Sequence, residues 1–246
     1  MNRSRVPLRT ALESPDSKSR YVRRLFSTIA DRYDLITVLL SFGLDARWKK
    51  RAVGLANVHH GTRALDLACG TGDIAFALND GGASVIGLDV THRMLVLAGE
   101  KRRRARSSLA GGPAFVTGDM MALPFPDGSF DLVTTGYGLR NVPDIGGALE
   151  EIHRVLKPGG RMLSLDFNRP EHLLVRGVYL AYLTVVGSVL GYALHRDPDT
   201  YRYIPESIRR YPGARGVVRL MEQQGFVDAS WQRVLGGFMA IHVATK

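Results

Sequence analysis

Two short stretches carry residue types that could do chemistry. In the first, "LDLACGTGD" at positions 65–73, an apolar run contains an acid and ends in a turn of small residues. Glycine lets a ligand approach the backbone closely, and a helix that begins at such a turn offers unpaired N–H groups. The stretch predicts a ligand-binding turn with the candidate residues Asp66, Ala68, Gly70, Thr71 and Gly72. The alternative is a structural turn, because neither the G-x-G-x-x-G pattern nor a Gly-Lys-Ser/Thr phosphate loop is present.

The second stretch, "GYGLRNVPD" at positions 136–144, sets Arg140 beside Asn141 just beyond another apolar run. A guanidinium stays charged and forks around an oxygen atom, and an asparagine amide adds a further donor. The two residues therefore either serve a turn, for example through an Arg140–Asp144 ion pair, or hold a flat ligand that carries negative charge.

The elements that must position these residues follow an α/β pattern. From Thr62 onward short β-rich runs alternate with helical stretches, which is typical of parallel β–α units. Strands are predicted at 62–68, 83–90, 113–119, 129–138 and 161–167, with a helix over 144–160. A helix stopped by Gly225 and two strands joined at Gly236–Gly237 follow. The prediction is a doubly wound, mostly parallel seven-stranded Rossmann-like sheet with a C-terminal antiparallel hairpin.

Three predicted strand ends carry polar groups at the same sheet edge. Asp89 ends the second strand, seventeen positions after Gly72, and Asp119 with Met120 ends the third. An acid at the end of the second strand can accept both ribose hydroxyls of an adenosine. The strand ends therefore predict one crevice that binds an adenosine-containing ligand.

Three segments stand outside this alternation. Residues 1–20 are interpreted as a flexible basic arm, and 21–246 as one domain that begins with N-terminal helices over 21–60. Residues 170–210 form a predicted helical lid, within which the eighteen residues 177–194 carry no charge. That length meets the lower limit for a membrane span. A buried or interfacial helix is favoured, because the segment lies between two elements of one sheet.

Composition limits the class of protein. The 246 residues carry a net charge of +10 and a single cysteine, Cys69. One cysteine excludes an internal disulfide framework and suits a reducing cytoplasm, and no residue spacing indicates a metal site. No nucleic-acid-binding motif accompanies the charge, so no nucleic-acid partner is predicted. Basic "KRRRAR" at 101–106 is interpreted as a solvated helix end, and attraction to an anionic membrane surface is compatible with the charge.

The strand-end constellation resembles class I S-adenosylmethionine-dependent methyltransferases. "LPFPDGSFDLVT", "YGLRNVPD", "ALEEIHRVLKPGGRMLSLDF" and "YRYIPESIRRYPG" are, more closely, similar to the ubiquinone/menaquinone C-methyltransferase family, over about residues 21–246. The resemblance implies S-adenosylmethionine as cofactor, with its ammonium group near Asp66 or Asp73. The residues expected at the cofactor are Asp66, Ala68, Gly70, Thr71, Gly72, Asp89, Asp119, Met120 and Gly136.

The same resemblance implies C-methylation of a reduced polyprenyl quinone precursor by a cytoplasmic enzyme that associates peripherally with the membrane. Loss of the hydroxyl proton from the quinol would place negative charge on the ortho ring carbon. Arg140, Asn141 and Asp166 are the expected catalytic residues, and Tyr33, Tyr137 and Tyr201 the expected substrate contacts. The proton acceptor stays open between Asp166 and His195, with Tyr201 as a relay. A role for Asp166 in a helix cap or an ion pair with Arg169 is an equal alternative.

The chain departs from the family's pattern at three places: Thr37 stands where asparagine is frequent, Asp45-Ala46 where His-Arg is frequent, and Gly136 where serine is frequent. Two alternative functions stay open. One is methylation of another small molecule, and the other is an inactive cofactor-binding accessory protein of quinone synthesis. The sequence leaves open whether the ring is a benzoquinol or a naphthoquinol, the prenyl length, and whether the chain forms a homodimer.

Overall fold

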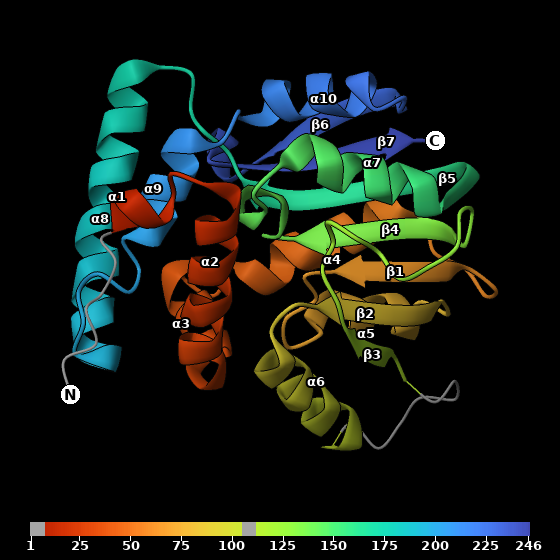
Figure 1. The fold of residues 1–246 in the computed structure, drawn as a ribbon, viewed down its shortest axis with the longest axis horizontal. Coiled ribbons are helices and arrows are strands. Elements are labelled where there is room, and N and C mark those ends of the chain that lie inside the picture. The colour runs from red at the N-terminus through yellow and green to blue at the C-terminus, as the bar shows by residue number, and fades with distance from the viewer. Residues whose placement is uncertain (1–7, 105–111) are drawn as a thin grey trace.

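The seven predicted strands form a single mixed sheet (Figure 1). The structure is a computed structural model that describes residues 8–104 and 112–246. The strands are β1 (Arg63–Leu67), β2 (Ser84–Asp89), β3 (Ala114–Thr117), β4 (Phe130–Gly136), β5 (Leu156–Phe167), β6 (Val227–Val234) and β7 (Met239–Thr245). Their order is β3-β2-β1-β4-β5-β7-β6. The first five strands in this order are parallel to one another, and β7 is antiparallel to both of its neighbours. The predicted fold class is confirmed.

Helices cover both faces of this sheet. The helices are α1 (Leu8–Ala11), α2 (Pro15–Ile29), α3 (Tyr33–Leu40), α4 (Asp45–Ala56), α5 (Asp73–Asp80), α6 (His92–Arg104), α7 (Ile145–Val155), α8 (Leu173–His195), α9 (Tyr203–Arg210) and α10 (Ala214–Gln223). Side chains alternate between the two faces of a strand. Leu65 and Leu67 accordingly pack with α7 and α10, whereas Ala64, the residue before Leu65, packs with α4 and α5. These two cores hold the strand ends in place.

The helix before β5 ends earlier than predicted. It stops at Val155 instead of residue 160, and β5 already begins at Leu156. Proline disfavours helical geometry in the residue before it and cannot donate to a helix. Pro158 therefore turns "LKPGG" into the bulged start of the strand, where the register against β4 shifts.

The N-terminal segment also differs from the expected flexible arm. Residues 8–20 are largely helical, and residues 1–7 lie outside the described part of the chain. Ser14 and Ser17 form a capping box at the start of α2, and Pro15 occupies the first turn, which are strong helix-start signals. Leu12 is buried and packs in a cluster with Tyr203 of α9. The domain boundary expected at residue 20 therefore falls inside a helix.

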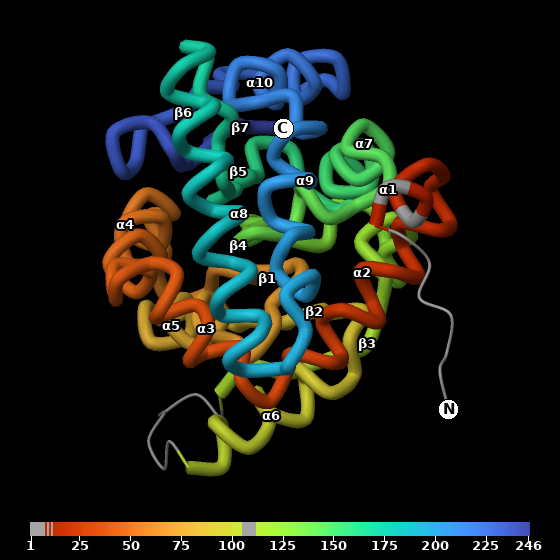
Figure 2. Tube along the Cα trace, turned by 90° about the vertical axis from the view of Figure 1, so that its left-hand side faces the viewer, coloured from red at the N-terminus to blue at the C-terminus, as the bar shows by residue number. Residues whose placement is uncertain are grey.

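The predicted lid consists of α8 and α9, which lie side by side beyond the C-terminal edge of the sheet (Figure 2). Helix α8 is long and apolar enough to cross a membrane, and its most apolar stretch of 18 residues has a mean hydropathy of 1.8. Only 17% of that stretch is buried inside the protein. Its inner side packs through Leu180, Leu183, Gly187 and Gly191. Burial of the whole helix, one of the two expected forms, is therefore not what the structure shows.

Candidate functional site

Three cavities meet at the carboxyl ends of β1, β2 and β4. The first, the strand-end cavity, is lined by Ala68, Gly70, Asp89, Thr91, Asp119, Met120, Gly136 and Asn141, among others. The second, the turn cavity, is lined by Asp66, Thr71 and Asp73, among others. The third, the apolar cavity, has a volume of about 150 Å³ and lies between α2, α3, α8 and α9. Tyr33 and Tyr137 line all three.

The strand ends place the predicted acids around the strand-end cavity. Asp89 ends β2 and accepts hydrogen bonds from the backbone N–H groups of Gly70 (2.9 Å) and Thr91 (2.7 Å). Asp119 accepts from the N–H of Met121 at 3.0 Å. Burial raises the pKa of Asp89, and the two N–H donors offset part of that rise. One carboxylate therefore holds the glycine turn while lining the cavity.

The turn after β1 is built from left-handed backbone. Gly70 (φ 55°) and Gly72 (φ 89°) adopt conformations that favour glycine, and Ala68 (φ 50°) shares them. Gly72 does not line any of the three cavities; it begins α5, and a Cβ there would meet the rings of Phe76 and Phe115 at 3.0 Å. The structure shows a packing role for Gly72, because its close approach is to aromatic side chains, and a cofactor contact at Gly72 stays a prediction.

The surroundings of the Asp66 carboxylate show whether the turn cavity suits a cationic group of a cofactor. Its side chain is buried, Oδ1 accepts from Thr134 at 2.8 Å, and Oδ2 has no hydrogen-bond partner among the described residues. Burial raises the pKa of Asp66 to about 7, with the Thr134 hydrogen bond opposing the rise. A buried carboxylate oxygen without a donor is costly. The turn cavity therefore suits a ligand ammonium group, as the amino group of S-adenosylmethionine would provide.

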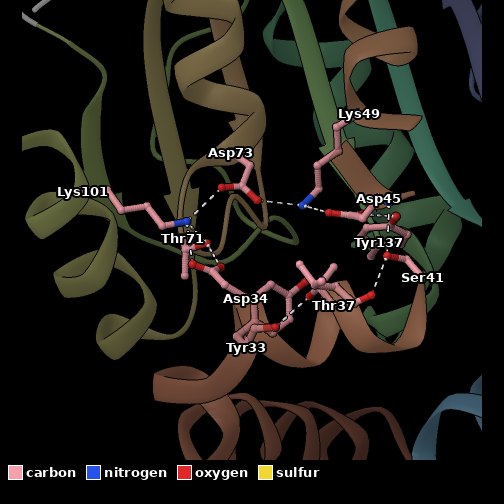
Figure 3. A network of polar contacts seen from close by, with 11 residues as sticks. Tyr33, Asp34, Thr37, Ser41, Asp45, Lys49, Thr71, Asp73, Lys101 and Tyr137 are labelled. Atoms are coloured by element: carbon pink, nitrogen blue, oxygen red, sulfur yellow. Dashed lines mark hydrogen bonds and ion pairs between the residues drawn. The ribbon is translucent and has the colours of Figure 1, made fainter. Parts of the chain in front are cut away.

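A network of alternating charges closes the turn cavity from the side of the N-terminal helices (Figure 3). Asp73 lies between Lys49 and Lys101, with both N–O distances at 2.9 Å. Lys101 also pairs with Asp34 at 2.8 Å, and Asp34 accepts from the Thr71 hydroxyl at 2.7 Å. Both lysines lower the pKa of Asp73 against the effect of its burial. Asp73 is therefore paired with two lysines, which leaves Asp66 as the carboxylate suited to a ligand ammonium.

Arg140 faces the apolar cavity and is fixed from three sides. Its Nε donates to Asp166 Oδ1 at 3.0 Å and its Nη1 to the Ser207 hydroxyl at 2.8 Å. The guanidinium also lies over the Phe167 ring, 4.8 Å from the centroid. Among the described residues no hydrogen bond engages Nη2. Only 6% of the residue is exposed, so a cation is held without rotational freedom at the wall of an apolar cavity.

Asp166 lies behind Arg140 instead of beside a ligand. It is fully buried, lines none of the three cavities, and accepts from the Arg140 N–H (3.2 Å), Arg140 Nε and the Phe167 N–H (2.8 Å). Burial raises the pKa of Asp166, and Arg140 offsets part of this effect. The geometry supports a positioning role for Asp166, and the alternative ion pair with Arg169 is not formed.

Asn141 and Tyr201 line different cavities. Asn141 lines the strand-end cavity, but its amide donates to the Tyr137 carbonyl (2.7 Å) and its Oδ1 accepts from Tyr203 (3.0 Å). Tyr201 lines the apolar cavity, and its hydroxyl lies 2.9 Å from His195 Nε2. Burial and the nearby Arg32 lower the pKa of His195, which keeps the ring neutral near pH 7.

Several residues at the cavities were not singled out from the sequence. Helix α2 contributes Ser19, Val22, Arg23 and Phe26 to the strand-end cavity, although Ser19 falls in the expected arm. Asp45 and Lys49, from α4, form an ion pair at 2.6 Å beside Tyr137. The signal for Asp45 was its departure from the family's pattern. No group of His, Cys, Asp and Glu that could hold a metal ion occurs among the residues of the described ranges.

Comparison with known sequences gives matches along nearly the whole chain. A family model described as the ubiE/COQ5 methyltransferase family matches residues 14–246. A demethylmenaquinone methyltransferase of Thermus thermophilus is 42% identical over 224 residues, which cover 90% of this chain and 100% of that relative. A ubiquinone/menaquinone biosynthesis C-methyltransferase of Marinomonas sp. is 37% identical over 234 residues, 94% of this chain and 92% of the relative.

Solved structures share the fold. A SAM-dependent methyltransferase of Thermotoga maritima, described as a possible histamine N-methyltransferase, superposes with a TM-score of 0.65 at 20% identity and covers 92% of this chain and 99% of its own. A phosphoethanolamine N-methyltransferase of Haemonchus contortus in complex with S-adenosyl-L-methionine gives a TM-score of 0.60 at 15% identity, over 81% of this chain and 52% of its own. At these identities the likeness concerns the fold.

Proposed function

The chain belongs to the ubiE/COQ5 methyltransferase family, and we propose that it transfers a methyl group from S-adenosylmethionine to a ring carbon of a reduced polyprenyl quinone precursor. The observation that carries the proposal is the meeting of a strand-end cavity and an apolar cavity at Tyr33 and Tyr137, with the fixed cation Arg140 on the apolar side. A quinol with a long apolar tail requires such a pair of cavities. Relatives named for this reaction match nearly the whole chain.

The residues present fit the cofactor. Asp89 lines the strand-end cavity with a carboxylate suited to a ribose, and Asp119 and Met120 line the adjoining part of that cavity. Asp66 Oδ2, which has no hydrogen-bond partner among the described residues, is suited to the ammonium group. When bound, S-adenosylmethionine supplies an electrophilic methyl group. The chain's part is to hold the acceptor ring against it and to exclude water.

Arg140 is the residue we assign to the developing oxyanion. C-methylation requires the quinol hydroxyl to lose its proton, so that negative charge spreads to the ortho carbon. A fixed guanidinium, with one terminal nitrogen that no described residue engages, stabilises that charge without reorganisation during the reaction. Asp166, Ser207 and Phe167 set the orientation of the guanidinium.

A turnover assay tests the proposed function. Purified protein and methyl-labelled S-adenosylmethionine are combined with chemically reduced demethylmenaquinol or a methoxy-polyprenylbenzoquinol. We expect label on a ring carbon of at least one quinol and none on an O-methylated product. Cofactor binding without label on either ring would contradict the proposal and favour another acceptor or an accessory role.

We further propose that the enzyme is cytoplasmic and docks peripherally on the membrane through an exposed apolar face. This face consists of Leu35, Val38, Leu39 and Phe42 at α3, and Leu174, Val178, Val185, Val189 and Tyr192 on α8. Ile36 and Leu40 of α3 and Leu190 and Leu194 of α8 belong to one hydrophobic cluster. Phe42 and Tyr182 line the apolar cavity and are also exposed, so the cavity opens on this side. A prenylated substrate could then enter directly from lipid.

Replacing Phe42 (77% exposed) and Val185 (64% exposed) with asparagine is expected to weaken binding to anionic vesicles at least roughly tenfold. Burying each apolar side chain in lipid contributes about 1.5–3 kcal/mol, and that contribution is lost. Vesicle co-sedimentation measures the effect, and Val227→Asn, on strand β6, is the matched exposed control. Unchanged sedimentation in the double variant, together with a concentration-dependent dimer in solution, would show that a second copy covers this face.

A further inference from the structure

The hydroxyl of Tyr137 lies in an arrangement that the reaction outlined above does not yet use. Tyr137 follows β4 with a left-handed backbone (φ 61°), which turns its side chain toward α4. Its hydroxyl lies 2.5 Å from Asp45 Oδ1, and Asp45 Oδ2 lies 2.6 Å from Lys49 Nζ. Because a carboxylate only accepts hydrogen bonds, Tyr137 donates its proton to Asp45. The lone pairs of the Tyr137 oxygen therefore stay available to accept a second proton.

The position of the reacting atoms limits which residue can accept the substrate proton. The hydroxyl that ionises is bonded to the carbon next to the one that receives the methyl group. The acceptor must therefore lie where the apolar cavity meets the strand-end cavity. Phe26, Tyr33 and Tyr137 line both cavities. Of these, within the described part of the chain, only Tyr137 has a hydroxyl that is hydrogen-bonded to a carboxylate.

The two acceptors predicted from the sequence do not meet this condition. Asp166 lines neither cavity and already accepts three hydrogen bonds from Arg140 and Phe167. The Tyr201–His195 pair lies among Ile29, Ile36 and residues of α8. Tyr201 lines the apolar cavity but not the strand-end cavity.

We propose that Tyr137 accepts the proton of the substrate hydroxyl and passes its own proton to Asp45. The inference rests on the proposed function, because it names the proton acceptor of that reaction. Tyr137 is the catalytic residue, and Asp45 is a positioning residue that acts through it. Lys49 holds Asp45 in place through the ion pair along α4.

The protons and electron pairs balance. The substrate O–H bond breaks as its proton reaches the Tyr137 oxygen, while the Tyr137 proton moves to Asp45 Oδ1. The electron pair left on the substrate oxygen moves through the ring, and the ortho carbon forms its bond to the methyl group as the S–CH₃ bond breaks. Loss of the ring-carbon proton, which leaves to solvent, restores the aromatic ring. Asp45 returns its proton to Tyr137, and Tyr137 returns a proton to the substrate oxygen. One proton is released to solvent per turnover.

The charges around Tyr137 explain why it needs Asp45 to pass a proton on. Burial and the neighbouring Asp45 raise the pKa of Tyr137 well above its ordinary value, so it is not a base by itself. The charged or titratable groups around the Tyr137–Asp45 pair are Lys49, Tyr33, Asp73 and Asp166. Asp73 and Asp45 outweigh burial and raise the pKa of Lys49, which keeps it cationic. Arg140 on the apolar cavity and the sulfonium charge favour the substrate oxyanion that forms.

The test measures ionisation of a bound probe without turnover. The probe is 4-methoxy-1-naphthol, whose absorbance changes on ionisation, bound with sinefungin, a cationic cofactor analogue that transfers no methyl group. We expect the naphtholate fraction at pH 7 to fall at least roughly tenfold in Tyr137→Phe and in Asp45→Asn, and to stay within about twofold in His195→Gln. Tyr137→Phe and Asp45→Asn each remove or neutralise one group without changing the carbon skeleton, so a second variant remains if one fails to fold.

Turnover gives the second readout. In Tyr137→Phe we expect kcat to fall by about 10²–10⁴ with KM changed little, and in Asp45→Asn we expect kcat to fall with KM likewise little changed. An unchanged naphtholate fraction in both variants, or a loss in His195→Gln alone, would overturn the relay. If the wild type ionises the naphthol but methylates neither quinol, the relay stands and the proposed function fails.

Discussion

Replacing Arg140 with methionine is expected to reduce turnover by at least about 10²–10³ while leaving S-adenosylmethionine binding close to that of the wild type. The guanidinium is the cation that faces the apolar cavity, and a fixed donor to a developing oxyanion contributes roughly 3–4 kcal/mol to transition-state stabilisation. The variant is also expected to lose about 3–5 kcal/mol of stability, because Asp166 is left buried and unpaired. Turnover, cofactor titration and thermal melting measure the three effects.

The double variant Arg140→Met with Asp166→Leu separates the two consequences. Replacing both members of a buried ion pair with apolar residues is often neutral for stability. We expect the melting temperature to return toward that of the wild type while turnover stays at the level of the single variant. Recovery of turnover along with stability would show that Arg140 serves the fold alone.

Replacing Asp66 with asparagine is expected to weaken S-adenosylmethionine binding by about ten- to a hundredfold at pH 8. The carboxylate oxygen Oδ2 has no hydrogen-bond partner among the described residues, and a charged hydrogen bond to a ligand ammonium contributes about 1.5–3 kcal/mol. Isothermal titration calorimetry measures the affinity. Asp73→Asn is the matched comparison, and we expect a smaller effect because Asp73 already pairs with Lys49 and Lys101.

The same substitution has an opposite effect on the cofactor-free protein. The pKa of Asp66 is raised from 3.8 to about 7, so its contribution to stability is complete below pH 4 and is lost as the pH rises to about 7. The loss amounts to roughly 4 kcal/mol at pH 8. We expect Asp66→Asn without cofactor to melt higher than the wild type at pH 8, and the difference to shrink toward pH 4.

The pH dependence of cofactor affinity completes this test. Wild-type affinity is expected to rise with pH up to about pH 7 and then to level off, because the ionised form of Asp66 binds the ammonium. The affinity of Asp66→Asn should lack this rise. A parallel pH dependence in both proteins would assign the ammonium to another group.

The sequence by itself determined the strand ends and the chemistry of the turn after β1. The short β-rich run around Leu65 and Leu67 and the small residues of "ACGTG" are local signals, and the structure places Asp66, Asp89 and Asp119 at one edge of the sheet as predicted. Parallel strands bring their carboxyl ends to the same edge whatever the rest of the chain does. The strand ends could therefore be predicted without coordinates.

Contacts between distant segments were decided by the tertiary structure. Asp45 and Tyr137 are 92 residues apart, and their hydrogen bond depends on how α4 packs beside the end of β4. The placement of Asp166 behind Arg140, and of Gly72 against two phenylalanines, likewise follows from packing. Neither the turn pattern nor the strand pattern encodes such neighbours, because side-chain contacts form only when separate elements meet.

The apolar segment at 177–194 shows the same division. Its composition determined a long apolar helix, and the structure has α8 over Leu173–His195. Composition did not determine which side of that helix would be covered. Packing of Gly187 and Gly191 against the connection between α8 and α9, at Tyr201 and Asp197, buries one side and leaves Val178 73% exposed on the other. Burial is a property of the neighbours that a helix meets, and those neighbours were set by the fold of the whole chain.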